Sequence, residues 1–275
     1  MRNRIFITLL FLALSPAAVG VKAQINDASE AIERGHGFFN RGQYELAIFE
    51  YRGALNWPGD HQARARFNIG VCEYKLGRPR EAVAEYRAAI KLREGRFPLA
   101  SYALGVALQD LGRYQEAREA FTQAVKSSDG KQAEALFELA LESQRAGDDR
   151  SAFEHYRRAI AQSRDGIPAC HNNLGVILAK AGLLEDAARE FEAAVKLSRG
   201  KFAEASQNLA RLRQMSDGSS PAMIACLKTV EIAQGSGIKA ERFRAGIIFH
   251  MTFDFGHLSF LGGVEEEQIE QEKSK

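Results

Sequence analysis

Apolar and small residues recur with one period between residues 28 and 202. An alanine is followed four residues later by an aromatic residue, and three residues after that by a second alanine. The pattern occurs five times, at Ala47/Tyr51/Ala54, Ala82/Tyr86/Ala89, Ala117/Phe121/Ala124, Ala152/Tyr156/Ala159 and Ala187/Phe191/Ala194. These spacings place the side chains on one face of a helix, where the small residues allow a neighbouring helix to approach closely. Each copy therefore predicts an amphipathic helix that packs against another helix.

A second apolar segment precedes each of these helices and ends at a glycine. The glycines stand at a fixed interval of 35 residues, at Gly42, Gly77, Gly112, Gly147 and Gly182. Upstream of them an apolar residue is followed by a small one, at Ile69-Gly70, Leu104-Gly105, Leu139-Ala140 and Leu174-Gly175, while the first unit has Arg34-Gly35. A glycine in this place is typical of a helix that ends with a left-handed backbone. The pattern predicts two helices in each unit, with the glycine between them.

A fixed period of this kind predicts a solenoid, in which each unit contacts only its neighbours. We expect five helix–turn–helix units, at residues 28–62, 63–97, 98–132, 133–167 and 168–202. Residues 203–215 repeat only the first-helix pattern, with Leu209-Ala210 near the centre, and are predicted to form a capping helix. The array is therefore predicted to be all-α.

The order Leu-Gly, Gly, Ala-x-x-x-aromatic and Ala resembles the tetratricopeptide repeat family, with one additional residue per unit in the inter-unit loop. The resemblance covers about residues 28–202. It implies a right-handed superhelical solenoid of helix–turn–helix repeats. It also implies that the first helix of each unit lines a concave face, where extended or helical peptides commonly bind.

The resemblance places three stripes of side chains on that concave face. The first is Ile32, Phe67, Tyr102, Phe137 and Asn172, the second is His36, Val71, Val106, Leu141 and Val176, and the third is Phe39, Tyr74, Gln109, Gln144 and Ala179. Four of the five residues in the second stripe are aliphatic, whereas the family often has polar residues there. Members that bind a C-terminal carboxylate use a lysine and an asparagine in the first two stripes, and no unit has that pair. We therefore expect no carboxylate clamp.

We expect instead a groove with an apolar floor that binds an amphipathic helix or an apolar strand of a partner protein. The groove residues are Phe67, Val71, Tyr74, Tyr102, Val106, Phe137, Leu141 and Val176, and the rim residues are Arg64, Lys75, Arg145 and Lys180. Two other interpretations remain open. The aliphatic residues only tighten the helix packing, or the tail of the protein itself fills the groove.

The first 23 residues have the layout of a secretory signal peptide. Arginines in Met1–Arg4 precede the apolar run Ile5–Leu14, and Val21-Lys22-Ala23 is a small-residue cleavage site. The apolar run has about half of the ~20 residues that a membrane-spanning helix needs. We therefore expect cleavage after Ala23, a periplasmic or secreted protein, and no transmembrane segment after signal removal.

The composition changes in residues 216–275. Ser216–Pro221 is predicted to be a linker, and apolar and polar residues alternate from Ile247 to Phe255, as in a half-buried strand. A single hairpin is not stable alone in water, so this short β-like tail either docks on the array or adds as a strand to another protein. The run Thr252–Leu261 is similar to the start of the periplasmic TonB C-terminal domain. The alternative function is therefore an envelope structural or energy-coupling component whose tail strand pairs with a partner. Val264–Lys275 is rich in glutamate.

Charge and motifs favour binding over catalysis. Of 37 basic residues, 34 remain after removal of the signal segment, against 35 acidic ones, and no basic block indicates nucleic acid. The six histidines have no spacing typical of a metal site, and a metal shared by His250 and His257 is the only arrangement left open. A phosphate-binding loop and a nucleophile elbow are both absent. We therefore expect no cofactor, no small-molecule substrate and no enzymatic activity, but a scaffold or adaptor that binds a protein or peptide.

The three cysteines are placed unevenly. Cys72 and Cys170 lie nearly three repeats apart, beyond the ~7 Å Cα separation that a disulfide allows in a stacked array. Cys226, outside the array, is able to reach one of them. The alternative is that the cysteines are small buried thiols.

Overall fold

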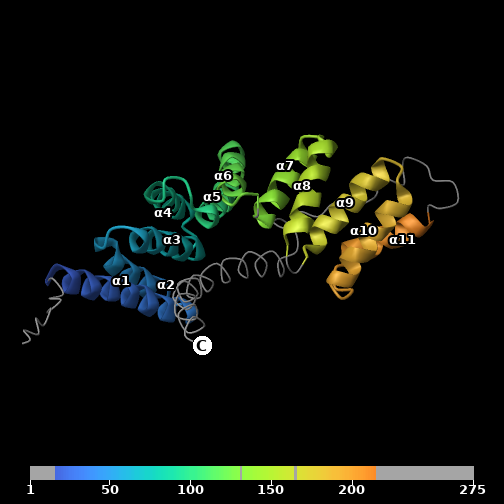
Figure 1. Cartoon of the computed structure of the whole chain (residues 1–275). Coiled ribbons are helices and arrows are strands. Elements are labelled where there is room, and N and C mark those ends of the chain that lie inside the picture. Colours follow the sequence, from blue (N-terminus) through green and yellow to red (C-terminus); the bar gives the residue numbers. More distant parts are fainter. Residues whose placement is uncertain (1–15, 131, 164–165, 215–275) are drawn as a thin grey trace, which may run out of the picture.

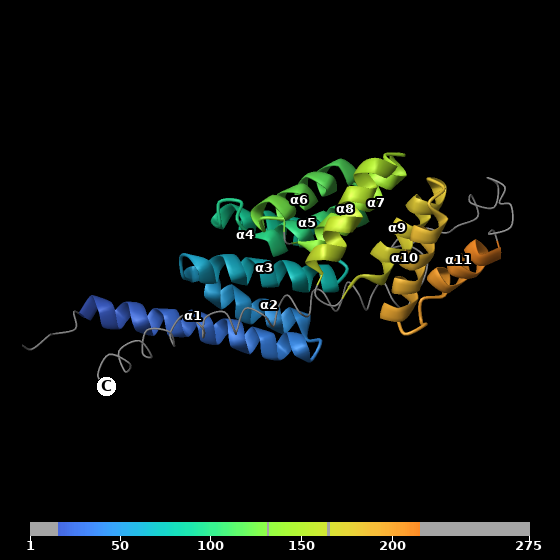
Figure 2. The same cartoon turned by 45° about the vertical axis from the view of Figure 1, so that its right-hand side comes forward.

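The computed structural model describes residues 16–130, 132–163 and 166–214, with side chains from residue 27 onward (Figure 1). Within these ranges the chain forms eleven α-helices and one short 3-10 helix, and no strand. The helices follow one another as antiparallel pairs along a curved array, with α1 and α2 at one end and α10 and α11 at the other (Figures 1 and 2). The predicted all-α solenoid is confirmed.

Each pair consists of a first and a second helix. The first helices are α1 (Pro16–Asn40), α3 (Asp60–Lys75), α5 (Pro98–Asp110), α7 (Ala133–Arg145) and α9 (Pro168–Lys180). The second helices are α2 (Tyr44–Gly53), α4 (Pro79–Leu92), α6 (Tyr114–Ser127), α8 (Asp149–Gln162) and α10 (Leu184–Leu197). The 3-10 helix η1 (Ala54–Asn56) extends α2, and α11 (Ala203–Gln214) follows the last pair.

The turn inside each pair contains a glycine with a left-handed backbone, as predicted. The five marker glycines have φ between 71° and 79°. At the end of α3, the N–H of Gly77 donates to the carbonyl of Tyr74 (3.0 Å), and the N–H of Arg78 donates to that of Glu73 (2.9 Å). These bonds satisfy carbonyls that the helix end leaves open. A Cβ on Gly77 would meet no atom within 4 Å, so the backbone conformation and not space requires glycine there.

The two helices of a pair approach closely because an aromatic ring of the second helix lies against a small residue of the first. Tyr86 of α4 packs on Gly70 of α3, where an added Cβ would lie 2.7 Å from a ring carbon. Phe191 of α10 packs in the same way on Gly175 of α9, at 2.8 Å. The small residue of the apolar–small pair therefore makes room for the ring at these two positions. Since Tyr86 is fully buried, its pKa is raised and the phenol stays neutral.

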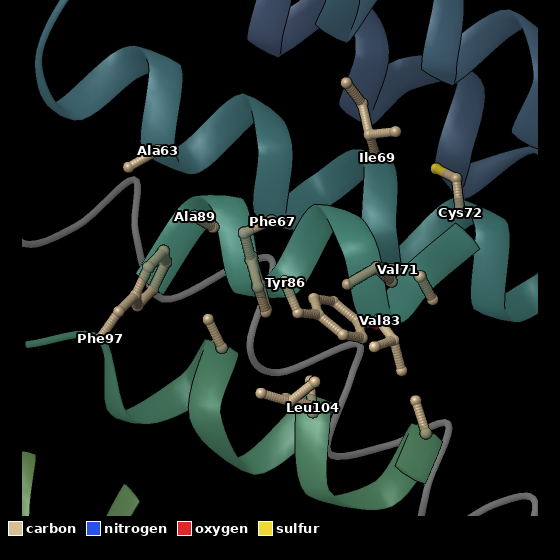
Figure 3. Close-up of a cluster of buried hydrophobic side chains, with 14 of the residues drawn as sticks. Ala63, Phe67, Ile69, Val71, Cys72, Val83, Tyr86, Ala89, Phe97 and Leu104 are labelled. Carbon is tan, nitrogen blue, oxygen red and sulfur yellow. The ribbon is translucent and has the colours of Figure 1, made fainter. Parts of the chain in front are cut away.

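The buried apolar side chains of the described residues form two clusters. The first extends over α1 to α6 and reaches Ala135, and the second extends over α7 to α11. Figure 3 shows part of the first cluster, in which the rings of Phe67 and Tyr86 lie 5.9 Å apart above α5. Val125 of α6 packs against both clusters from its partly buried position. The core therefore divides at the contact between α6 and α7.

The two cysteines in the described part of the chain, Cys72 and Cys170, are buried free thiols. Burial raises the pKa of Cys72 to about 12, so the thiol is protonated and unreactive at neutral pH. The third, Cys226, lies outside the described residues, so its disulfide stays a prediction.

Both predicted terminal segments lie wholly or mostly outside the described residues. Helix α1 begins at Pro16 and continues through Ala23, the predicted cleavage position. The tail predicted at residues 216–275 is not described. No helix within the described ranges has the length and apolar character required to cross a membrane.

Candidate partner-binding face

Side-chain hydrogen bonds join α1 to α3, α3 to α5, α5 to α7, and α9 to α11. Each bond connects residues about one unit apart in the sequence. The bonds are His36–Asn68 (3.2 Å), Tyr74–Asp110, Gln109–Glu138 (3.2 Å) and Asn208–Asn172 (2.9 Å). We call the three predicted stripes, together with Asn68, Asp110, Glu138 and Asn208, the first-helix face. This face runs the length of the array.

The aliphatic stripe of this face is buried. Val71, Val106, Leu141 and Val176 occupy the same register on α3, α5, α7 and α9, and are between 0% and 4% exposed. Side chains this buried pack against neighbouring residues, so they do not form an open floor in this structure. Their direct contact with a partner stays a prediction.

The aromatic residues of the first stripe pack inside their own units. Each ring lies against the aromatic residue of the second helix in the same unit, at an orientation common for ring pairs in protein cores. The centroid separations are 5.9 Å for Phe67–Tyr86, 5.7 Å for Tyr102–Phe121 and 5.8 Å for Phe137–Tyr156. These rings therefore pack the two helices of a unit against each other.

The third stripe holds three partly exposed polar residues of the face. Tyr74, Gln109 and Gln144 are partly exposed. The hydroxyl of Tyr74 donates to Asp110, and Gln144 accepts a hydrogen bond from the hydroxyl of Tyr156 (3.0 Å). A phenol and two amides in one row provide both donors and acceptors.

Two of the predicted rim cations form ion pairs. Arg145 lies 2.6 Å from Glu142, and Lys180 lies 3.4 Å from Asp149. Arg64 and Lys75, the other two rim residues, are partly buried. At Arg145 and Lys180 the rim therefore carries negative as well as positive charges.

A fourth stripe, one residue after the first, was not recognised from the sequence. Its buried polar members are Asn68, Glu138, Asn173 and Asn208, and the same register has Glu33 and Ala103 in the other two units. Asn173 donates to the hydroxyl of Tyr156 (3.0 Å), which compensates the desolvation of both groups. The signal was present in the sequence, because five of the six residues in this 35-residue register are polar.

The face offers groups for non-covalent recognition. Burial lowers the pKa of His36, so its ring is neutral at physiological pH and hydrogen-bonds to Asn68. No group of three or more His, Cys, Asp or Glu residues suited to a metal ion occurs in the part of the chain that the structure describes. The arrangement presented at the third stripe is suited to hydrogen bonding with the amides of a peptide.

Structures with the same architecture are known at low sequence identity. The pilF protein of Pseudomonas aeruginosa is 18% identical, with a TM-score of 0.54, and the alignment covers 82% of this chain and 99% of that one. MamA of Desulfovibrio magneticus is 20% identical, with a TM-score of 0.51 and coverage of 64% and 97%. YrrB, described as a TPR protein with an unusual peptide-binding site, is 19% identical, with a TM-score of 0.51 and coverage of 69% and 95%. At these identities the similarity concerns the fold alone.

The family to which the chain belongs is shown by a match to a family model, not by the similar structures. No curated protein matches this sequence. The family model of the tetratricopeptide repeat matches residues 32–97, 102–167 and 142–201, which together make up more than half of the chain. These ranges include α3, α4, most of α5, and α6 to α10, with the turn glycines and the aromatic–glycine contacts described above. The chain therefore belongs to the tetratricopeptide repeat family.

Proposed function

We propose that the protein is a non-catalytic adaptor that binds a peptide or helix segment of a partner protein on its first-helix face. Tetratricopeptide proteins are protein-interaction scaffolds. The observation that carries the proposal is the series of hydrogen bonds linking successive first helices, which makes one continuous polar face from α1 to α7. A related structure described as having a peptide-binding site supports the same mode of action.

The partner contacts the third stripe, which is accessible without a rearrangement of the face. Tyr74, Gln109 and Gln144 lie on three successive first helices and keep partial exposure. Their polar groups exchange hydrogen bonds with the partner's backbone, while the partner's apolar side chains approach the aliphatic stripe next to them. Because that stripe is buried, its contact requires a local displacement of side chains around Val106 and Leu141.

We further propose that the adaptor works in the cell envelope after export. Support comes from the sequence of residues 1–23, in which basic, apolar and small-residue segments occur in the order of a signal peptide. The envelope component with a strand-pairing tail, drawn from the alternation between Ile247 and Phe255, is the alternative. The two proposals differ in the part of the chain that holds the partner.

Site-specific photo-crosslinking tests the proposal and its alternative. A benzoylphenylalanine at Tyr74 is compared with one at Glu119, an exposed residue of the second helix α6. We expect a partner band from Tyr74, none from Glu119, and the same Tyr74 band in a protein lacking residues 216–275. Equal bands from both positions contradict the first-helix face. Loss of every band on tail deletion favours the strand-pairing alternative.

A further inference from the structure

A cavity of about 610 Å³ lies between α6, α7 and α8, where the core divides into two clusters. Its apolar lining is Val125, Leu136 and Leu139. At about 100° per residue, Leu136 and Leu139 lie on a different face of α7 from Leu141. The cavity is therefore separate from the first-helix face.

An ion pair that forms at the preceding junction between units is missing at the cavity. One junction earlier, Arg87 of α4 and Glu116 of α6 lie 2.6 Å apart and form an ion pair between the two units. One period later in the sequence, these two positions are Thr122 and Ser151, and both line the cavity. Two short hydroxyl side chains in place of Arg and Glu leave the space open.

A second pair is also missing at the same place. In the second unit Arg66 and Glu85 lie 2.9 Å apart, and in the fifth unit His171 lies 2.7 Å from Glu190. The equivalent residues of the fourth unit are Leu136 and His155. With leucine opposite, Nδ1 of His155 is buried without a hydrogen-bond partner among the described residues. Other buried side-chain atoms, such as Nδ1 of His61, have no partner among the described residues either, so this nitrogen offers a group for hydrogen bonding but does not by itself indicate a ligand.

The remaining lining is strongly cationic. Arg118, Lys126 and Arg158 border the cavity, and none of them forms an ion pair within the described residues. The guanidinium of Arg158 lies close to Gly130, where an added Cβ would be 3.1 Å from one nitrogen. Asp129 is the single acidic residue of the lining. By contrast, Arg113, the residue before α6, is paired with Glu116 of α6 at 2.6 Å.

We infer that this cavity is a second docking site, which binds an acidic amphipathic segment of a partner protein. Carboxylates of that segment pair with Arg118, Lys126 and Arg158, where charge-assisted hydrogen bonds are strongest. Apolar side chains of the same segment cover Val125 and Leu139. This inference rests on the proposed scaffold function in one respect, namely that the ligand of the cavity is a segment of a protein. The array then holds two partners on two different sides.

The test uses the full chain and a fluorescein-labelled helical peptide of glutamate and leucine, with a glutamine-for-glutamate peptide as control. Fluorescence anisotropy should show binding of the glutamate peptide alone. Arg158→Ala and Arg118→Ala should each weaken it about tenfold, which is the loss expected for one hydrogen bond to a charged group. Arg157→Ala is the matched control, because this arginine lies on the same helix over the ring of Phe153 and outside the cavity.

A cavity-filling variant provides an independent check. Thr122→Arg with Ser151→Glu rebuilds the ion pair of the preceding junction, and should abolish peptide binding without lowering the melting temperature. The inference is overturned if the glutamate peptide does not bind, or if Arg157→Ala weakens it as much as Arg158→Ala. It is also overturned if inorganic phosphate displaces the peptide at constant ionic strength, since the cavity would then be a phosphate site. Crosslinking at Tyr74 does not depend on any of these results.

Discussion

The first and the second helices of each unit differ in how they are buried. In α5, every residue from Ala100 to Leu108 is buried, whereas in α8 only Ala152, Tyr156 and Ala159 are. A helix buried on all sides is part of the core, and one with a single apolar face is its outer layer. The first helices therefore carry both the packing and the candidate binding face, and the second helices are free to vary on their outer side.

The largest expected effect is a truncation inside a first helix. Leu108 of α5 is 1% exposed, and Leu108→Ala should lower the free energy of unfolding by about 2–5 kcal/mol, from lost burial and the cavity left behind. Leu92→Ala on the second helix α4, where the side chain is 41% exposed, should change it by about 0.5 kcal/mol or less. Urea denaturation measures both. Similar losses would remove the distinction between the two helix classes.

A pair of glycine substitutions separates close packing from backbone conformation. In Gly105→Ala the new methyl group would meet the ring of Phe121, so we expect a loss of about 1–3 kcal/mol from overpacking. In Gly112→Ala there is open space, but φ is +71°, and the left-handed backbone should cost about 1–2 kcal/mol. Crystal structures of the variants should show a displaced ring in the first case only. An undisturbed Phe121 would contradict the account of helix approach.

The buried amide side chains should contribute to the free energy of unfolding at the C-terminal end of the array. Asn208→Ala removes the donor to Asn172 and should cost about 1–3 kcal/mol, because a buried acceptor loses this bond. A double-mutant cycle with Asn172→Ala measures the coupling between the two residues. Additive losses would indicate that the amides act independently of each other.

The smallest effect is expected on the outer side, at a surface ion pair. The side-chain hydrogen bond from Arg113, and then that from Arg87, holds the pKa of Glu116 below its ordinary value of 4.5. Because the folded pKa is the lower one, this contribution is present above about pH 4.5 and is lost as the pH falls through the folded pKa. Titration by NMR should show the Glu116 pKa rising towards 4.5 in Arg113→Ala. An unchanged pKa would mean that the pair does not form in solution.

Features with a strict sequence period could be predicted from the sequence. The turn at Gly77 needs a residue that adopts a left-handed backbone, so its glycine repeats every 35 residues. The positions of Gly70 and Tyr86 also recur, as small and aromatic residues, but the contact between them is seen only in the structure. The degree of burial of Val71 and Val106 could not be predicted in the same way. Their exposure depends on the packing of several helices, which a pattern within one helix does not contain.

The polar contacts were harder to foresee for a different physical reason. Bonds such as Gln109–Glu138 join residues in different units, and neither residue identifies its partner in the sequence. The cavity beside His155 could not be predicted from the sequence alone. At two places, residues that form ion pairs in other units are replaced here, and this is recognised only after the structure shows that residues such as Arg66 and Glu85 are paired.

The central claim is that partners bind on the first-helix face, and a pair of triple variants tests it most directly. Tyr74→Ala, Gln109→Ala and Gln144→Ala change partly exposed side chains of that face. The matched control changes three exposed residues of second helices to alanine, namely Lys91, Gln115 and Glu119.

Both variants are expressed in the native host cell, and the recovery of the partner identified by Tyr74 crosslinking is quantified by mass spectrometry. The account predicts recovery reduced about tenfold or more for the first variant, from the loss of several hydrogen bonds, and unchanged recovery for the control. Equal recovery with both folded variants would contradict it.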